Sequence, residues 1–191
     1  MIKHLAMIMD GNRRWAKKNK LSYANGYTEG GFGAAKVAAQ FCLDSEIKYL
    51  SLYAFSLENF SRPQYELDII FNAIVNEGQK QLEFFKKGNV RVRFIGDREK
   101  FPEKVVPTIE MLEKETVQND LLNVNILFCY GARQEIICSV KQLFNKIKNG
   151  ILSEDQISEE TLEGCLWTSG TPAPELIIRT SGAQRLSNFL L

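Results

Sequence analysis

The sequence predicts an α/β fold, a single domain with a mostly parallel central sheet flanked by helices. Two observations support this prediction. Short runs of β-forming residues alternate with longer segments of helical periodicity, and no internal repeat or low-complexity linker divides residues 1–191. The composition, with 45% hydrophobic and 25% charged residues, is typical of a globular domain. A domain of this length buries roughly 70% of its unfolded surface, which is enough for one self-sufficient core.

Five short runs are predicted to be strands because they are apolar, rich in β-forming residues and followed by turn residues. In chain order they are His4–Met9, Tyr49–Phe55, Val90–Ile95, Val124–Cys129 and Leu176–Ile178. The segments between them carry apolar residues at helical spacing. These predicted helices cover about residues 31–45, 66–87, 103–118, 133–149 and 158–166.

The predicted strands end in polar segments that contain glycine, hydroxyl, amide and charged residues. These segments are 10–12 (Asp-Gly-Asn), 56–59 (Ser-Leu-Glu-Asn), 96–98 (Gly-Asp-Arg), 130–133 (Tyr-Gly-Ala-Arg) and 179–182 (Arg-Thr-Ser-Gly). Because ligands of open α/β sheets bind beyond the carboxyl ends of the strands, we expect the functional site there. Polar loops and turn glycines are common in any protein, but they do not explain the arginines after so many of these ends.

Charge, histidine and cysteine content exclude several classes of function. The formal net charge is +1, so no global positive field indicates nucleic-acid binding, and we expect no nucleic-acid partner. His4 is the only histidine, which argues against a histidine-based triad or a histidine-rich metal site. The cysteines have no C-x-x-C spacing and are interpreted as buried thiols of a reducing compartment; they are Cys42, Cys129, Cys138 and Cys165.

Targeting and membrane-spanning segments are not evident in the sequence. No apolar run reaches the roughly 18 residues of a membrane span. The stretch Leu5–Met9 is too short for the core of a signal peptide. We therefore expect a cytoplasmic protein, and peripheral contact with the inner face of a membrane stays open at this stage.

Familiar phosphate-binding motifs do not fit the sequence. The segment GGFGAAK (30–36) lacks the third glycine of a dinucleotide fingerprint, and no G-x-x-x-x-G-K-[S/T] element of a P-loop occurs. In IMDGN (8–12), Ile8 occupies the position of the nucleophilic aspartate of aspartyl-phosphate phosphatases. A Rossmann-like nucleotide-binding enzyme is therefore a weaker alternative.

The segment HLAMIMDGNRRWAKK (4–18) places one carboxylate, that of Asp10, directly before four cations within residues 13–18. A metal-bound anion between the carboxylate and the cations would account for both. Mg²⁺ prefers oxygen ligands and keeps several waters, so one carboxylate plus phosphate oxygens makes a sufficient site. Gly11 permits close backbone approach, and the N–H groups after it can hold phosphate at the start of the next helix.

This segment, together with YAFSLENFSRP (53–63) and IIRTSGAQRLSNFLL (177–191), resembles the cis-prenyltransferase family, which includes the bacterial undecaprenyl diphosphate synthases. The resemblance extends over almost the whole chain, including NVRVRFIGD (89–97) and YGAR (130–133). The D-D-x-x-D motif of the trans-prenyltransferases is absent, which fits the cis class.

The resemblance implies a reaction. Isopentenyl diphosphate is condensed with an allylic diphosphate, farnesyl diphosphate in bacteria, and loss of a proton leaves a cis double bond. Repeated cycles make a long polyprenyl diphosphate such as undecaprenyl diphosphate, the lipid carrier precursor for cell-wall peptidoglycan synthesis, while the chain grows into an apolar tunnel. The resemblance also implies Mg²⁺ as the cofactor, a homodimer, and membrane contact through the lipid product.

The resemblance assigns roles to individual residues. Asp10 is expected to hold the metal and, with Asn59, to serve the chemistry. The residues expected to bind substrate are Gly11, Asn12, Arg13, Arg14, Trp15, Tyr23, Tyr27, Ser56, Leu57, Glu58, Phe60, Arg62, Arg179, Arg185 and Ser187. Of these, Arg179, Arg185 and Ser187 would bind isopentenyl diphosphate.

Two of these assignments have structural alternatives. Segment 56–63 has the features of a helix-entry loop, with Ser61 as a cap and Pro63 opening the helix. Arg179 at a strand end could simply pair with a carboxylate. The apolar face of the 66–87 helix is core by default, and we expect part of it to line the tunnel together with Leu122 and Val124. Its members are Leu67, Ile70, Phe71, Ile74, Val75, Leu82 and Phe85.

The sequence departs from the family pattern in the segment SYANGYTEGG (22–31). Tyr23 and Tyr27 stand where the family usually has an arginine and a histidine. A phenol can donate to phosphate but carries no positive charge, so diphosphate contacts there are expected to be weaker. Arg13, in place of a common glycine, can restore part of the charge.

The end of the sequence carries a second departure. The chain stops at Leu191, where the family continues, so we expect these residues to be part of a longer chain. The run RLSNFLL (185–191) predicts the start of a helix packed on the sheet. A non-catalytic accessory subunit of a heteromeric prenyltransferase is the main alternative function. Such subunits tend to lose the residues equivalent to Asp10 and Asn59, which are both present here.

Overall fold

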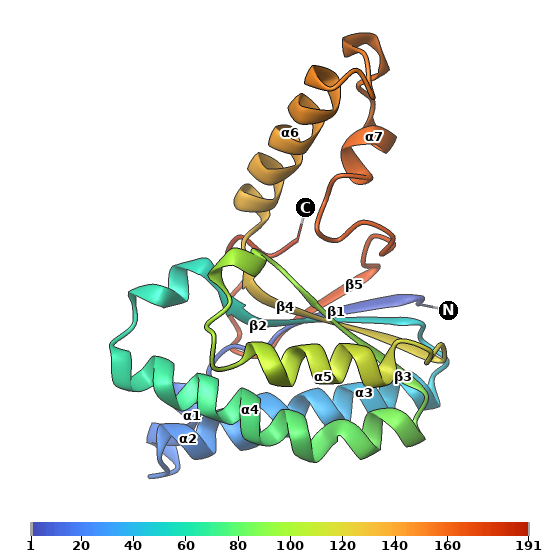
Figure 1. Ribbon diagram of the computed structural model, residues 1–191. Coiled ribbons are helices and arrows are strands. Elements are labelled where there is room, and N and C mark those ends of the chain that lie inside the picture. Colours follow the sequence, from blue (N-terminus) through green and yellow to red (C-terminus); the bar gives the residue numbers. More distant parts are fainter. Residues whose placement is uncertain (1, 191) are drawn as a thin grey trace.

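The computed structural model describes residues 2–190 and contains one five-stranded sheet (Figure 1). In chain order the strands are β1 (His4–Ile8), β2 (Tyr49–Ser56), β3 (Val90–Ile95), β4 (Leu122–Tyr130) and β5 (Leu176–Arg179). Every neighbouring pair is parallel, and the order across the sheet is β3-β4-β2-β1-β5. The predicted α/β class and all five predicted strands are confirmed.

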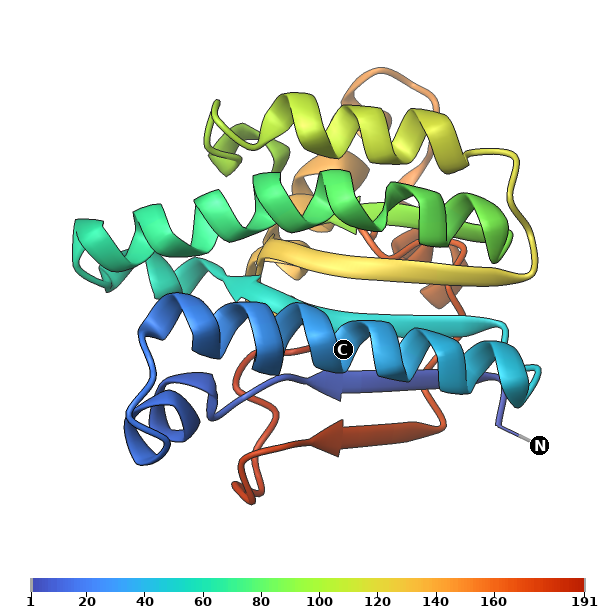
Figure 2. The ribbon, with the colours of Figure 1, turned by 90° about the horizontal axis from the view of Figure 1, so that it is seen from below.

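Helices cover the two faces of the sheet unequally. Figures 1 and 2 show α3, α4 and α5 side by side over one face, while α6 and α7 extend from the opposite side. The helices are α1 (Asn12–Lys18), α2 (Tyr23–Asn25), α3 (Ala34–Asp44), α4 (Gln64–Lys87), α5 (Val106–Thr116), α6 (Ala132–Lys148) and α7 (Glu159–Glu163), with shorter turns η2 (Leu57–Ser61), η3 (Arg98–Lys100) and η4 (Glu154–Gln156). No helix within residues 2–190 has both the length and the apolar composition needed to cross a membrane.

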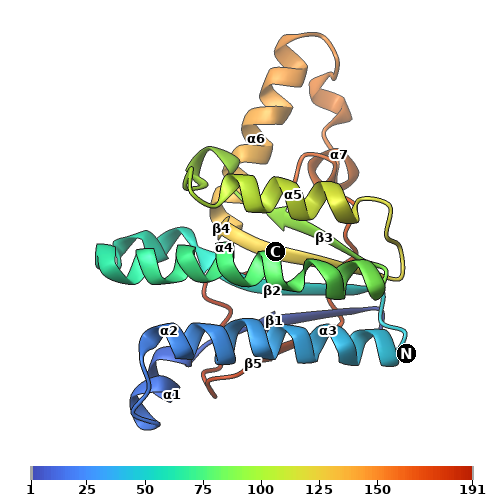
Figure 3. The ribbon, with the colours of Figure 1, turned by 60° about the horizontal axis from the view of Figure 1, so that its bottom comes forward.

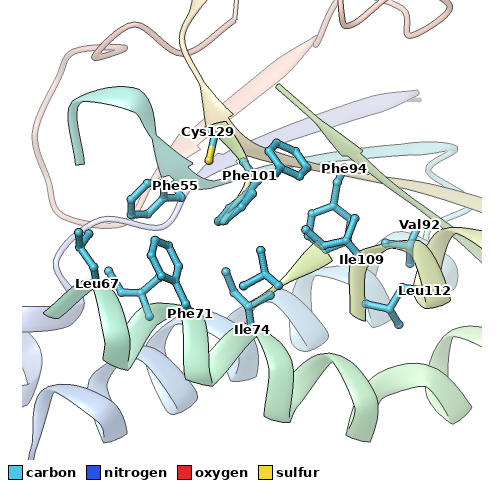
Figure 4. Packing of buried hydrophobic residues seen from close by; sticks show 13 residues of the cluster. Phe55, Leu67, Phe71, Ile74, Val92, Phe94, Phe101, Ile109, Leu112 and Cys129 are labelled. Atoms are coloured by element: carbon cyan, nitrogen blue, oxygen red, sulfur yellow. The ribbon is translucent and has the colours of Figure 1, made fainter. Parts of the chain in front are cut away.

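The largest core cluster lies between α4, α5 and the sheet (Figure 4). Phe128 of β4 is completely buried and is the centre of an aromatic group. Its ring centroid lies 5.0 Å from that of Phe101 and 5.5 Å from that of Phe55, in edge-on or tilted arrangements that favour aromatic attraction. Burial of each such side chain contributes about 1.5–3 kcal/mol, so this layer fixes α4 and α5 on the sheet.

The segment before α3 differs from the prediction. The helix expected from about residue 31 begins earlier, because residues Gly26–Gly33 form a π-helical segment, η1, that follows α2 without a break. Glycines disfavour helix, so the sequence pattern predicted none before about residue 31. Close packing on α1 explains the glycines: a Cβ on Gly30 would lie 2.6 Å from Asn12 Oδ1, and one on Gly26 would lie 2.8 Å from the Asn12 carbonyl oxygen.

The predicted helix in the run that starts at Arg185 is wrong for the part that the structure describes. Residues 183–190 are irregular. Ser187, Asn188 and Leu190 have positive φ, which a right-handed helix does not allow. The apolar character of the run is explained instead by Phe189, which is fully buried and stacks on Tyr53 with ring centroids 4.7 Å apart.

The cysteines are free thiols, and three of them are buried as predicted. Cys138 is the exception, since it is only partly covered. It lies on α6, which stands away from the sheet in Figure 1 and therefore lacks a packing layer on its outer side.

The sheet topology brings distant loops together. β1 pairs with β2 on one side and with β5 on the other. From β2 the chain goes to β3 at the far edge and then to β4, which lies between β3 and β2. It finally returns to add β5 on the opposite side of β1 (Figure 3). The strand order therefore reverses beside β1. The carboxyl ends of β1 and β5 flank the crevice where α/β proteins bind ligands.

Candidate active site

The loop after β1 makes a tight turn at Gly11. This residue has φ +99°, a left-handed conformation that residues with a Cβ rarely adopt. A Cβ on Gly11 would also lie 3.6 Å from Ser181 Cβ in the loop after β5. Gly11 thus lets the two strand-end loops approach closely.

A polar pocket of about 310 Å³ lies against this turn. Its lining combines one carboxylate with three guanidinium groups, so it suits an anion with several oxygens. The lining residues, which define the polar pocket, are Met9, Asp10, Gly11, Asn12, Arg13, Arg14, Tyr27 and Arg62. They come from the β1 loop, α1, η1 and the segment before α4.

Asp10 is held by side chains that all contact the same carboxylate oxygen. Arg179 donates to Oδ2 from Nε (3.1 Å) and Nη2 (2.8 Å), and Ser181 Oγ donates to it at 2.6 Å. Arg14 Nη2 lies 3.4 Å from the same oxygen. No described residue donates a hydrogen bond to Oδ1, so this second oxygen is available to another ligand.

The same contacts keep Asp10 ionised. Partial burial opposes ionisation, but the hydrogen bonds from Ser181 and Arg179 and the charges of Arg179 and Arg14 outweigh it and lower the pKa to about 2. Asp10 therefore carries a full negative charge throughout the neutral pH range.

Arg179, the last residue of β5, connects the loop after β1 with the segment after β5. Besides Asp10 it contacts Ser187 Oγ (2.9 Å) and the carbonyl oxygen of Arg185 (2.7 Å), to which its Nη1 donates. Its side chain is only 11% exposed. The structural alternative for Arg179, pairing with a carboxylate, is thus observed, and the carboxylate is itself a predicted site residue.

A larger apolar cavity of about 710 Å³ opens from the same sheet edge and runs between the sheet and helices α3 and α4. Its mouth carries polar residues, including Ser56, Asn59 and Ser187, and its interior is apolar. The residues that line both this apolar cavity and the polar pocket are Met9, Asp10, Asn12, Tyr27 and Arg62. These five residues form the junction between an anion-binding space and an apolar space.

All of the predicted tunnel residues belong to or pack against the core clusters, and only some of them also line the apolar cavity. Those that line the cavity are Ile70, Ile74, Phe85 and Val124. Those that do not line it are Leu67, Phe71, Val75, Leu82 and Leu122. A helical face does not show by its spacing which side chains meet a cavity and which meet other side chains.

The segment that begins at Ser56 has both a structural and a site-forming role. Asn59 Oδ1 accepts a hydrogen bond from the Ser56 backbone N–H (3.2 Å), and Ser61 Oγ donates to the Glu58 carbonyl oxygen (2.8 Å). These bonds shape the turn η2 that leads through Pro63 into α4. The side chains of Ser56, Glu58 and Asn59 at the same time line the apolar cavity.

Tyr27 and Arg62 contact each other and a buried carboxylate, Glu66 of α4. Burial of the phenol and the hydrogen bond that it donates to Glu66 raise the pKa of Tyr27 well above its ordinary value. Tyr27 therefore remains a neutral phenol at the junction. Tyr23, the other departure from the family pattern, lies under Arg13, with the guanidinium carbon 5.2 Å from the ring centroid.

Five predicted substrate-binding residues lie outside both spaces. They are Trp15, Tyr23, Leu57, Phe60 and Arg185. Trp15 is 41% exposed and Phe60 stacks edge-on against Phe55, whereas Leu57 packs against the core. Arg185 contacts Arg179 through its backbone carbonyl. Their roles in binding stay predictions.

The structure adds residues to the site that the sequence reasoning missed. Ser181 holds Asp10, Glu66 holds Tyr27 and Arg62, and three further side chains line the mouth of the apolar cavity. These three are Arg133, Gln134 and Asn188. Ser181 and Arg133 follow strands, and Glu66 lies four residues after Arg62, which precedes the helix α4. Neither position by itself predicts a site residue.

An anion pocket lined by guanidinium groups, joined to an apolar cavity at the carboxyl ends of a parallel sheet, defines a class of protein. It is an α/β enzyme built for an amphiphilic substrate with an anionic head and an apolar tail.

Comparison with known proteins identifies the family. Residues 8–191 match the family described as "Putative undecaprenyl diphosphate synthase". An isoprenyl transferase of Clostridium perfringens is 40% identical over 191 residues, all of this chain and 75% of that protein. A Buchnera aphidicola protein named "Ditrans,polycis-undecaprenyl-diphosphate synthase ((2E,6E)-farnesyl-diphosphate specific)" is 40% identical over 188 residues, 98% of this chain and 74% of that protein.

A solved structure agrees with the sequence matches. The crystal structure of lavandulyl diphosphate synthase from Lavandula x intermedia in complex with dimethylallyl diphosphate has a TM-score of 0.95 and 31% identity, covering 100% of this chain and 82% of that one. The chain therefore belongs to the undecaprenyl diphosphate synthase family of cis-prenyltransferases. The family predicted from three sequence motifs is confirmed, and isoprenoid diphosphates are its substrate class.

Proposed function

We propose that the protein condenses isopentenyl diphosphate with an allylic diphosphate, farnesyl diphosphate in the first cycle, and builds a long cis-polyprenyl diphosphate such as undecaprenyl diphosphate. The observation that carries this proposal is the junction of the polar pocket and the apolar cavity. An allylic diphosphate with its head in the polar pocket and its tail in the apolar cavity has its breaking C–O bond at this junction. The name of the Buchnera relative supports farnesyl diphosphate as the primer.

The guanidinium groups of the polar pocket are proposed to stabilise the leaving diphosphate. When the allylic C–O bond breaks, negative charge builds on the diphosphate oxygens. Arg13, Arg14 and Arg62 line the space that these oxygens would occupy. Fixed donors aimed at developing charge lower the barrier because they need little reorganisation during the reaction.

Mg²⁺ is the proposed cofactor, with Asp10 as its protein ligand. Asp10 fits this role because it is ionised and keeps one carboxylate oxygen without a hydrogen bond. No group of three or more histidine, cysteine, aspartate or glutamate residues within the described chain could hold a metal by itself. Diphosphate oxygens and waters would therefore complete the shell, as Mg²⁺ commonly accepts. When bound, the ion neutralises charge on the leaving group.

Arg179 and Ser187 are proposed to bind the diphosphate of isopentenyl diphosphate, with Arg185 reaching it from the same loop. Arg179 lies between Asp10 and Ser187, so a diphosphate held there would be next to the first one. Ser56 and Asn59 at the mouth of the apolar cavity would then face the reacting double bond. The double bond of isopentenyl diphosphate attacks the allylic carbon and forms the new C–C bond as the diphosphate leaves. The isopentenyl unit then loses a proton, which restores a double bond in the product.

The test of the proposed function is incorporation of radiolabelled isopentenyl diphosphate into butanol-extractable product, with farnesyl diphosphate as primer and Mg²⁺ present. Chromatography of the dephosphorylated product measures its chain length. Polyprenyl products that require both Mg²⁺ and the primer would support the proposal. A purified, folded protein that incorporates no label with any allylic primer would contradict it.

We also propose that the protein is a homodimer that associates through α6. The residues Ile137, Val140 and Phe144 form an apolar stripe at helical spacing and are 55%, 54% and 65% exposed. Figure 1 shows α6 standing away from the sheet with α7 beside it. A second copy of the same helix, placed by a two-fold axis, would cover this stripe with a surface of the same character.

Replacing Phe144 with glutamate is expected to convert the dimer to a monomer, because the contact would then bury one glutamate from each copy and remove both charges from water. Sedimentation velocity at micromolar concentration measures the change. Val37→Glu is the matched control, since Val37 of α3 is 71% exposed but lies on another helix. Equal sedimentation of all three proteins would contradict α6 as the interface.

A further inference from the structure

Glu66 lies in the first turn of α4, directly behind the polar pocket, and its side chain is completely buried. A carboxylate removed from water is costly unless neighbouring groups compensate its charge. Glu66 itself lines neither the polar pocket nor the apolar cavity. Its partners do.

Three side chains that line the polar pocket converge on this one carboxylate. Tyr27 Oη and Arg62 Nη1 donate hydrogen bonds to Oε1 at 2.7 Å and 3.0 Å. Arg62 Nη1 also donates to the phenol oxygen of Tyr27 at 2.8 Å. On the other side, Arg13 Nη1 lies 3.3 Å from Oε2. The two guanidinium groups and the phenol are therefore tied to a single buried anchor.

Arg13 depends on this anchor for its orientation. Its side chain is 49% exposed, and Glu66 Oε2 receives no hydrogen bond from the described residues. The ion pair and the ring of Tyr23 beneath the guanidinium are the contacts that direct it. An arginine that is held in advance loses less rotamer freedom when it binds an anion, so the pairing favours diphosphate binding.

A second buried glutamate shows that burial alone does not indicate a role in the active site. Glu135 of α6 is also fully buried, and it accepts hydrogen bonds from Thr168 N (2.7 Å) and Oγ1 (2.8 Å) and from the phenol of Tyr130. None of these partners is a cation or lines the polar pocket. Glu135 joins α6 to the segment after α7, which is a role in the fold.

We propose that Glu66 is a positioning residue of the active site, which holds Arg13, Arg62 and Tyr27 as one unit against the diphosphate head of the allylic substrate. This inference rests on the proposed function and assigns a role to a residue that touches no substrate. It also explains the tyrosine at position 27. A phenol can donate to Glu66 and accept from Arg62 at once, and it thereby links carboxylate and guanidinium.

The test is the variant Glu66→Gln. Its amide keeps the size and the acceptor oxygen for Tyr27 and Arg62, but an NH₂ group replaces the oxygen that faces Arg13. We expect the KM for the allylic diphosphate to rise about tenfold, as for one lost charged hydrogen bond. We expect kcat to fall as well, because Arg13 is also proposed to stabilise the charge on the leaving diphosphate. Calorimetry with inorganic pyrophosphate should show a similar loss of affinity without any turnover.

Glu135→Gln is the matched control. It removes the charge of an equally buried glutamate, so it measures the effect of such a change on the fold. We expect it to lower the melting temperature at least as much as Glu66→Gln and to leave KM and pyrophosphate affinity unchanged. A lower melting temperature of Glu66→Gln with unchanged KM and pyrophosphate affinity would overturn the inference, and so would tighter binding of pyrophosphate.

A double-mutant cycle tests whether Glu66 acts through Arg13. If it does, Arg13→Gln and Glu66→Gln are not additive, and the double variant has the KM of Arg13→Gln alone. Additive effects of the two substitutions on KM would contradict the proposal that Glu66 acts through Arg13. If Glu66→Gln does not fold, Glu66→Asp serves instead, because its shorter side chain cannot reach Arg13 and Arg62 together. Its KM should rise at least threefold, and an unchanged KM would overturn the inference.

The pyrophosphate measurement distinguishes failure of the proposed function from failure of the proposed role of Glu66. A wild-type protein that binds pyrophosphate but makes no polyprenyl product would contradict the proposed function and leave the role of Glu66 measurable. A wild-type protein that makes product, with Glu66→Gln indistinguishable from it in both assays, would contradict the role of Glu66 alone.

Discussion

Replacing Asp10 with alanine is expected to lower kcat at least about a hundredfold while the allylic diphosphate still binds. The metal that Asp10 is proposed to hold acts on charge that develops in the transition state, and loss of such stabilisation typically costs this much. Binding should survive because Arg13, Arg14 and Arg62 still line the polar pocket. The variant also frees Arg14 from its pairing with Asp10, so its guanidinium group remains available to the allylic diphosphate.

Steady-state kinetics at saturating Mg²⁺ and calorimetry with the allylic diphosphate measure the two effects separately. Asp10→Asn is the matched variant, since it keeps the size of the side chain and an oxygen that can accept from Arg179 and Ser181. It should be nearly as slow as Asp10→Ala, because a neutral amide is a poor Mg²⁺ ligand. More than a tenth of the wild-type turnover in either variant would show that Asp10 is not the metal ligand.

Replacing Arg179 with alanine is expected to weaken isopentenyl diphosphate binding about ten- to a hundredfold, as for a lost hydrogen bond to a charged group. The loss of Arg179 also removes two hydrogen bonds from Asp10 Oδ2. Because these bonds help to lower the pKa of Asp10, its carboxyl pKa should rise toward the ordinary value. The allylic substrate should bind almost as before.

Arg179→Lys is the conservative comparison. A lysine keeps the charge, but its single ammonium group cannot contact Asp10, Ser187 and the Arg185 carbonyl oxygen together as the guanidinium does. It should recover only part of the affinity. KM values for both substrates decide the assignment: equal losses for the allylic and the isopentenyl diphosphate would mean that the two diphosphate sites are assigned wrongly.

The strands were predictable because each is a short run of apolar, β-forming residues that ends at turn residues. This local signal marks even the edge strand β5, whose residues Leu176, Ile177 and Ile178 are exposed. Val90–Ile95 was located to the residue, and the other strands to within two residues at either end. The helical conformation of residues 26–30 was not predictable, since Gly26 and Gly30 are explained by close packing on Asn12 and not by helix propensity. A contact with a residue of another helix cannot be inferred from the sequence of the segment itself.

The site was predictable where residues follow strand ends, and less so where side-chain direction decides. Asp10, Asn59 and Arg179 all lie at the predicted edge of the sheet. Arg185 and Trp15 belong to the same motifs, yet their side chains line neither space. Glu66 was missed because an acidic residue in the first turn of a helix is ordinarily explained by the helix dipole. Only its burial beside two guanidinium groups indicates another role.

The hydrogen bonds between Asp10 and Arg179 join residues 169 positions apart in the chain. Contacts of such long sequence separation form late in folding, after the intervening chain has lost most of its freedom. β5, which carries Arg179, is an edge strand that pairs with β1 alone among the described strands. The other four strands and the layer of α3, α4 and α5 can therefore assemble while Asp10 still lacks Arg179. A folding intermediate of this kind would have most of its secondary structure and no complete site, so the ability to capture isopentenyl diphosphate would arise last, with the docking of the final strand.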